Sequence, residues 1–152
     1  MMISEVEQAK AIARKQHAGQ TRWDKVTPYI THPIAVSERF DSPLFKVVAL
    51  LHDVVEDTPM TLDRLREAGV REHAVKCVDH LTKREGEEYL AYIQRVASDP
   101  ISAAVKVADI EHNLMNLKKG SMRDKYHLAR ELLYMYAIRI HNVDLDAYLR
   151  KI

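Results

Sequence analysis

The sequence has little glycine and little cysteine, and these shortages exclude several classes of protein. Only four glycines occur among the 152 residues, so a glycine-rich phosphate loop of the Walker or Rossmann type is excluded. The single cysteine, Cys77, has no partner for an internal disulfide and is expected to be a small buried side chain. A reducing, cytoplasmic environment is therefore the default expectation.

Strong net charge and long apolar runs are also absent. The formal net charge is +1 at pH 7, which argues against a nucleic-acid partner. No stretch approaches the roughly 18 consecutive apolar residues of a membrane span, and the N-terminal segment lacks the apolar centre of a signal peptide. Hydrophobic residues make up 47% and charged residues 30%, as in ordinary globular proteins. We expect one domain over residues 1–152 and no membrane association.

Strand-like alternation is nearly absent, whereas apolar residues recur at helical spacing throughout the chain. This pattern predicts an all-α helical bundle with one long loop over 19–31. Ser4 as a cap, Pro33 and Pro43 in first turns, and Gly69 and Gly120 as stops mark helix ends. The expected helices are 4–18, 32–40, 43–56, 61–68, 71–82, 86–98, 101–118, 121–141 and 143–150.

The segment LLHDVVEDTP (50–59) places four ionisable residues directly after an apolar run: His52, Asp53, Glu56 and Asp57. If the preceding helix continues through them, His52 lies beneath Glu56 and Asp53 beneath Asp57. Three crowded carboxylates repel one another unless a cation compensates their charge. A divalent metal with mixed nitrogen and oxygen ligands would supply that cation.

Further ligands must come from other segments. His32 stands directly before a helix-initiating proline, and Asp109 interrupts the apolar stretch AAVKVADIEHNL. Taken alone, each is compatible with a structural role; Asp109, for example, could simply pair with Lys106. Taken together, they favour a metal site between three helices, as helical bundles build them. Its expected ligands are His32, His52, Asp53 and Asp109.

Three blocks of sequence resemble the HD-domain phosphohydrolases, and within them the small stand-alone form of the RelA/SpoT-type guanosine polyphosphate hydrolases. They are TPYITHPIAV (27–36), ALLHDVVEDTPMT (49–61) and VKVADIEHNL (105–114). A fourth block, LTKREGEEYLAYIQRVASDP (81–100), looks like the stretch that precedes the last block in bacterial single-domain members.

The resemblance implies that the four residues above hold manganese. It also implies hydrolysis of the 3′-diphosphate of ppGpp or pppGpp to GDP or GTP and pyrophosphate, with no synthesis, because the chain has no room for a synthesising domain. Glu56 and Asp57 match the family's Glu-Asp pair and would orient or deprotonate the attacking water; which one is the base stays open. Asn113 matches a nucleotide-contacting asparagine.

A diphosphate substrate also needs cationic partners. Arg22, Lys25, Lys83 and Arg84 are the candidates. Trp23 follows Arg22 where the family pattern has a lysine, so one positive charge is lost and a stacking surface for a base is gained. A lone tryptophan is, however, more often a core or loop anchor than a platform for a base.

Several alternatives stay open. The substrate could be another nucleotide, such as ppApp or the 2′-phosphate of NADPH, or the chain could be a non-catalytic nucleotide-sensing HD module. The segment YHLARELLYMYAIRI (126–140) is expected to be core, with a homodimer contact left open. His112 could reach the site, although a supporting or exposed role is favoured. The other histidines are expected to be surface or packing residues: His17, His73, His80, His127 and His141.

Overall fold

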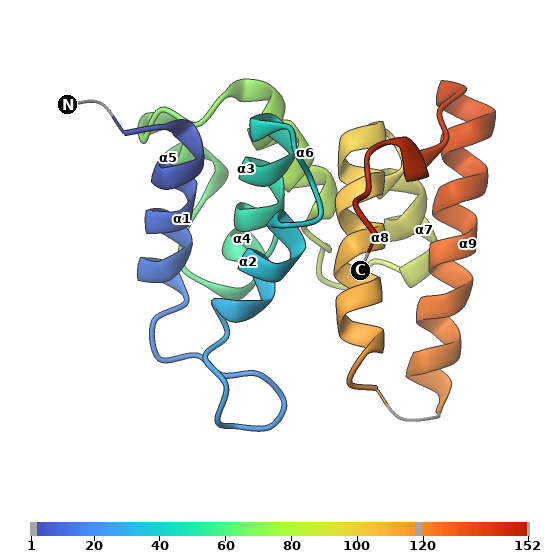
Figure 1. Ribbon diagram of the computed structural model, residues 1–152, viewed down its shortest axis with the longest axis horizontal. Coiled ribbons are helices and arrows are strands. Elements are labelled where there is room, and N and C mark those ends of the chain that lie inside the picture. Colours follow the sequence, from blue (N-terminus) through green and yellow to red (C-terminus); the bar gives the residue numbers. More distant parts are fainter. Residues whose placement is uncertain (1–2, 118–119, 152) are drawn as a thin grey trace.

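The computed structural model describes residues 3–117 and 120–151, and within them the regular elements are helices (Figure 1). One isolated antiparallel bridge, between Thr21 and Pro28, closes the long loop. The all-α prediction is therefore confirmed. The helices are α1 (Glu5–Gln16), α2 (Thr31–Ser37), α3 (Pro43–Leu51), α4 (Val54–Asp57), α5 (Leu62–Glu67), α6 (Glu72–Leu81), α7 (Tyr89–Val96), α8 (Pro100–Leu114), α9 (Ser121–His141) and a final 3-10 turn, η1 (Leu145–Ala147).

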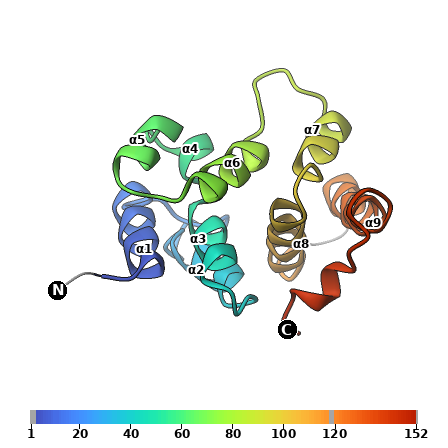
Figure 2. The ribbon, with the colours of Figure 1, turned by 90° about the horizontal axis from the view of Figure 1, so that it is seen from above.

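The helices form two groups that meet along α3, α6 and α8. Figures 1 and 2 show α1, α2 and α3 together at one end of the molecule and α7, α8 and α9 at the other. Helix α3 contacts α1, α2, α6 and α8. Its residues from Val47 to Leu51 are all buried, since a helix enclosed by others must be apolar all round.

Most helix ends follow the signals in the sequence. Ser4 forms a capping box with Glu7 at the start of α1, and Pro43 occupies the first turn of α3. Gly69 has the left-handed φ of 94° that commonly follows a helix. Gly120 was wrongly predicted to stop α8: that helix ends at Leu114, and Gly120 precedes α9 instead. Lys118, the expected end of that helix, lies outside the described residues.

The predicted helix 43–56 is wrong near its C-terminal end, because α3 ends at Leu51 and α4 begins at Val54. The His52 ring nitrogen Nδ1 lies 2.5 Å from the carbonyl oxygen of Ala49. A side chain that bonds to the backbone in this way competes with the hydrogen bond that would continue the helix. The chain therefore turns at His52 and Asp53.

The expected helix 143–150 is also wrong, since only a 3-10 turn forms there. The left-handed Asn142 (φ 55°) ends α9 first. The segment then returns to the body of the molecule, where the guanidinium of Arg39 donates to the carbonyl oxygen of Arg150 and to Glu111. Among the described residues, no helix combines the length and the apolar character needed to cross a membrane.

Candidate metal and nucleotide site

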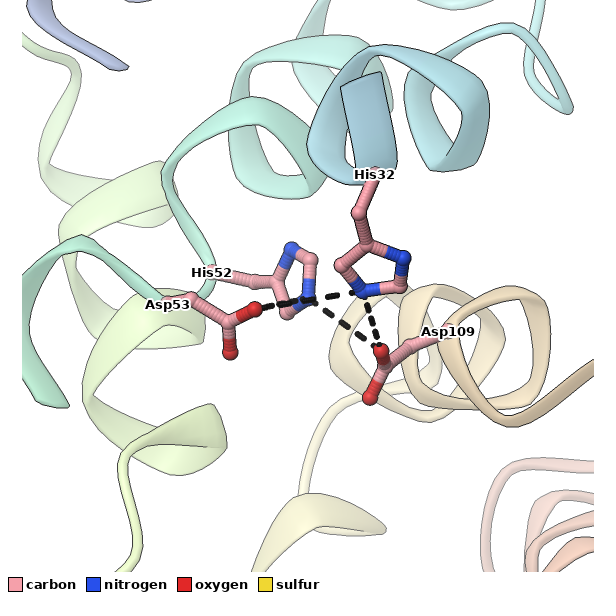
Figure 3. A group of neighbouring side chains, drawn as sticks. All are labelled: His32, His52, Asp53 and Asp109. Atoms are coloured by element: carbon pink, nitrogen blue, oxygen red, sulfur yellow. Dashed lines mark hydrogen bonds and ion pairs between the residues drawn. The ribbon is translucent and has the colours of Figure 1, made fainter. Parts of the chain in front are cut away.

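Four side chains from three parts of the fold meet between the two groups of helices (Figure 3). His32 lies in the first turn of α2, His52 and Asp53 lie in the turn between α3 and α4, and Asp109 lies in α8. One nitrogen or oxygen of each side chain lies within 4.8 Å of all the others. The structure thus brings together the four residues that the sequence predicted as a cluster.

The four side chains converge through two ring nitrogens and two carboxylate oxygens. His32 Nε2 lies 2.7 Å from Asp109 Oδ1, and His52 Nε2 lies 3.0 Å from Asp53 Oδ2. The crossed distances are 3.4 Å from His52 Nε2 to Asp109 Oδ1 and 3.9 Å from His32 Nε2 to Asp53 Oδ2. Such a mixed donor set suits a divalent transition metal.

The hydrogen bonding of His52 supports the same interpretation. Its Nδ1 faces the Ala49 carbonyl, which can only accept, so Nδ1 carries the proton and Nε2 offers a lone pair. This Nε2 atom is buried and has no hydrogen-bond partner. A buried polar atom without a partner is costly, and a bound cation would remove that cost. The four residues therefore form a candidate site for a divalent metal.

Both carboxylates of the cluster favour the ionised form. Burial raises the pKa of Asp53, but in the metal-free protein the positive charge of a protonated His52 outweighs burial and brings the pKa to about 2. Burial likewise raises the pKa of Asp109, yet the buried ammonium of Lys106, 2.8 Å away, holds it well below its usual value. Asp109 therefore pairs with Lys106 and belongs to the cluster at the same time.

Glu56 and Asp57 lie beside the cluster on α4. Their carboxylates and that of Asp53 all come within 4.8 Å of one another, and Glu56 Oε1 accepts a hydrogen bond of 2.7 Å from the backbone N–H of Lys83. Burial, followed by the charges of Asp53 and Glu56, raises the pKa of Asp57 to about 6. Asp57 can therefore exchange a proton near neutral pH.

Two residues that the sequence analysis did not name as part of the site hold its side chains in place. The hydroxyl of Tyr29 donates a short hydrogen bond to Asp53 Oδ2. His17 is 2% exposed, and its ring lies 4.8 Å from that of Tyr29. Tyr29 lies in the long loop before α2, where helical spacing gives no signal, so only the fold shows that it reaches Asp53.

His112 supports the site, as the sequence analysis favoured. Its Nδ1 lies 2.7 Å from Nδ1 of His32, on the side of that ring away from Asp109. Its place three residues after Asp109 puts it one turn further along α8.

Arg22, Trp23 and Asn113 form a chain of contacts that leads from the long loop to the metal cluster. The Arg22 guanidinium lies over the Trp23 ring at 5.2 Å and donates to Asn113 Oδ1 at 3.0 Å. Asn113 in turn donates to Asp109 Oδ1 at 3.2 Å. Beside this chain is a hollow of about 700 Å³, lined by Arg22, Trp23, Asp24, Thr27, Thr31, His112 and Asn116.

A second hollow, of about 200 Å³, adjoins Glu56 and contains three lysines. Burial lowers the pKa of Lys106, but Asp109 and the neighbouring tyrosines outweigh burial, so this lysine stays charged. Lys125 Nζ lies 4.0 Å from the centre of the Tyr89 ring. The lining residues are Glu56, Lys83, Tyr89, Tyr92, Lys106, Met122, Lys125 and Tyr126.

Two of the predicted cations are placed differently. The Arg84 guanidinium binds the Asp79 carboxylate at 2.6 Å and backbone carbonyls at the end of α6. Lys25 is exposed in the turn of the long loop, with a left-handed φ of 61°, and is absent from the lining of both hollows. A substrate contact for either residue stays a prediction.

Comparison with known proteins finds that the chain is similar to part of several bacterial guanosine polyphosphate proteins. It is 35% identical over 158 residues to the bifunctional (p)ppGpp synthase/hydrolase SpoT of Escherichia coli K12. It is 36% identical over 152 residues to the guanosine-3′,5′-bis(diphosphate) 3′-pyrophosphohydrolase of Haemophilus influenzae. A probable GTP pyrophosphokinase of Mycobacterium leprae is 36% identical over 153 residues. The matches cover 93%, 89% and 93% of this chain, respectively.

The chain spans about a fifth of the length of these relatives: 22%, 22% and 19%, respectively. No protein-family model matches. Among solved structures, a metazoan ortholog of SpoT described as hydrolysing ppGpp has the same fold, with a TM-score of 0.75 and 23% identity. That match covers 97% of this chain and 92% of the other. The chain is therefore a homologue of the SpoT-type (p)ppGpp proteins and has the helical fold of a metazoan SpoT ortholog.

Proposed function

We propose that this protein is a metal-dependent pyrophosphohydrolase that removes the 3′-diphosphate from ppGpp and pppGpp, releasing GDP or GTP and pyrophosphate. The observation that supports this most is the convergence of His32, His52, Asp53 and Asp109 directly beside two further carboxylates. The names of the relatives include this same reaction. We assign the four residues as the ligands of one divalent ion, with manganese as the expected metal.

A cation held there would act as a Lewis acid on the phosphoryl group and on water. Asp57 would accept the proton of the attacking water, because a base with a pKa of about 6 is mostly ionised at neutral pH. Glu56, held by the backbone N–H of Lys83, would orient that water. The water oxygen would bond to the phosphorus attached to the ribose 3′ oxygen, the bond between that 3′ oxygen and phosphorus would break, and the 3′ oxygen would take the proton that Asp57 had accepted.

The two hollows would hold the two ends of the substrate. The nucleoside fits the larger hollow, where Trp23 offers a stacking face and Arg22 a cation; stacking of one base on an aromatic ring contributes about 1–3 kcal/mol. The leaving pyrophosphate would lie toward Lys83, Lys106 and Lys125, because its negative charge needs cationic partners.

Ion-exchange chromatography of the products tests the proposal. Metal-stripped protein is incubated with ppGpp, with and without manganese, beside an Asp53→Ala variant. We expect GDP and pyrophosphate only when both manganese and Asp53 are present. Asp41→Ala is a matched control, because this carboxylate is 87% exposed and pairs with Arg150 at 3.7 Å rather than with a residue of the cluster. Equal release by Asp53→Ala would contradict the assigned site.

A second candidate substrate follows from Trp23, which stands where the family pattern has a lysine. A lost cation and a gained stacking face could shift the preference to another nucleotide, so ppApp and NADPH belong in the same assay. Faster cleavage of either would assign Trp23 to specificity. No cleavage of any of the three would favour a nucleotide-sensing module.

A further inference from the structure

A second cluster of metal-ligating side chains joins α6 to the start of α8, away from the site described above. His73 and Cys77 lie four residues apart on α6, and Asp99 is the N-cap of α8. One ligand atom of each comes within 4.8 Å of the other two. Asp99 precedes Asp109 by ten residues, which is about 15 Å along a helix.

The chemistry of the cluster is that of a transition-metal site. Residues four apart share one face of a helix, so an imidazole and a sulfur point to the same carboxylate. The two oxygens of Asp99 have different partners. Oδ1 accepts a hydrogen bond of 2.7 Å from the backbone N–H of Ile101, while Oδ2 lies 2.7 Å from His73 Nε2. One oxygen therefore stays with the helix, and the other faces the cluster.

Cys77 is fully buried and is not poised for oxidation. Burial, followed by the charge of Asp99, raises the pKa of its thiol to about 12. A thiol of this kind loses its proton when a metal takes the proton's place. On the same face of α6, His80 Nδ1 is buried without a hydrogen-bond partner.

We propose that His73, Cys77 and Asp99 bind one zinc ion that ties α6 to the start of α8. On binding, the S–H bond breaks, its proton passes to solvent, and a sulfur–zinc bond forms. The thiolate and the carboxylate together balance the charge of the ion. Ligand atoms on tetrahedral zinc lie about 3.4 Å apart, so His73 Nε2 and Asp99 Oδ2 must separate by about 0.7 Å, and no other ligand pair must approach by more than about 1.4 Å. The His73 side chain is 50% exposed and leaves room for water as fourth ligand.

Cobalt tests the proposal, because a thiolate bound to Co²⁺ gives a charge-transfer absorption that histidine and carboxylate ligands do not give. The chain has one cysteine, so this absorption reports Cys77 alone. We expect the band to appear when the metal-stripped protein of residues 1–152 is titrated with Co²⁺, and to disappear when zinc is added. Cys77→Ala should abolish the band.

Two conservative substitutions test whether His73 and Asp99 bind the metal together with Cys77. His73→Gln and Asp99→Asn should each raise the cobalt midpoint by at least about ten-fold. Asn caps a helix as well as Asp, so Asp99→Asn keeps α8 intact. His127→Gln, on the exposed part of α9, is the control and should leave the midpoint unchanged. No thiolate band at saturating cobalt, or equal midpoints in His73→Gln, Asp99→Asn and the parent, would overturn the proposal.

Equilibrium dialysis with zinc gives an independent measurement. The parent should bind one more zinc per chain than Cys77→Ala, whose fold is checked by circular dichroism. Equal zinc content in the two folded proteins would also overturn the proposal. Neither measurement uses ppGpp, so the outcome is separate from the test of hydrolysis.

Discussion

At the scale of single residues, His112 determines how His32 can act as a ligand. Their Nδ1 atoms lie 2.7 Å apart, so one must donate and the other accept. Burial, followed by the charges of His32 and Arg22, lowers the pKa of His112 to about 4, and His112 is therefore neutral at pH 7. With its proton on Nε2, His112 accepts at Nδ1, and His32 keeps Nε2 free to bind a metal.

His112→Phe should therefore weaken metal binding by about 10- to 100-fold, the usual effect of removing the partner of a ligating histidine. Titration of metal-stripped protein with manganese measures the affinity. His127→Phe, an exposed histidine on α9, should bind as the parent does. An unchanged affinity in His112→Phe would mean that His32 is held by other contacts.

Asp57 predicts a particular pH dependence in the metal-free protein. Its pKa of about 6 exceeds the ordinary value of 3.8, so between these values the folded state binds more protons than the unfolded state. The free energy of unfolding then falls as the pH rises through this window. Asp57→Asn removes this slope, so its stability relative to the parent should increase from about pH 4 to about pH 7. Urea unfolding at several pH values measures the difference; a constant difference would contradict the raised pKa.

The residues that the sequence analysis singled out were those whose charge conflicts with the apolar segment around them. Asp53 and Asp109 are carboxylates inside apolar segments, and such carboxylates need a partner. Tyr29 and His17 have no such conflict, because Tyr29 lies in the predicted loop and His17 at a predicted helix end, where polar side chains are ordinary. Only the folded arrangement shows that they lie against the cluster.

At the scale of elements, the break between α3 and α4 is what allows two adjacent residues to reach one site. Neighbouring residues on a continuous helix point about 100° apart, so His52 and Asp53 would diverge. The turn lets both face the space between α2 and α8 (Figure 3). Apolar periodicity predicted one helix here because it takes no account of the hydrogen bond between the His52 side chain and the Ala49 carbonyl oxygen.

The same arrangement predicts where a bound cation acts on dynamics. The ligands come from α2, the α3–α4 turn and α8, so manganese should slow amide hydrogen exchange in these segments. Helix α5 carries no ligand and should change least. Hydrogen–deuterium exchange followed by mass spectrometry measures this, with Asp53→Ala as the control that should show no response. Slowing spread evenly over all helices would indicate global stabilisation instead.

At the scale of the whole molecule, Glu111 connects segments that are far apart in the sequence. It accepts from Arg39, after α2, and from Arg130 in α9, each at 3.2 Å. Arg39 also holds the C-terminal segment through the carbonyl of Arg150. None of these contacts involves a residue predicted for the site, so their role is structural.

Glu111→Ala removes the carboxylate that the partly buried guanidinium groups of Arg39 and Arg130 share, leaves Arg130 with only the exposed Glu131, and should lower the free energy of unfolding by about 1–3 kcal/mol. Urea unfolding measures the change. Glu131→Ala removes a carboxylate that is 74% exposed and should cost less than about 0.5 kcal/mol. Equal effects of the two substitutions would show that Glu111 contributes no more than a surface charge.

The helical class could be predicted from the sequence because helical spacing recurs along most of the chain. The extent of the domain, 1–152, and a homodimer through 126–140 stay predictions. On α9 the apolar side chains of Leu128, Met135 and Ile138 are exposed, which the periodicity of that segment alone did not reveal. Burial depends on which neighbours a helix meets, and these are set by the tertiary fold.

The fluorescence of Trp23 can report on the hollow that we propose for the nucleoside. Trp23 is the only tryptophan of the chain, its side chain is half exposed, and it borders the space beside Arg22. Its fluorescence therefore comes from one known place in the fold. A nucleotide entering the hollow would change that emission in the absence of any turnover, so affinity can be followed without labels in variants that no longer react.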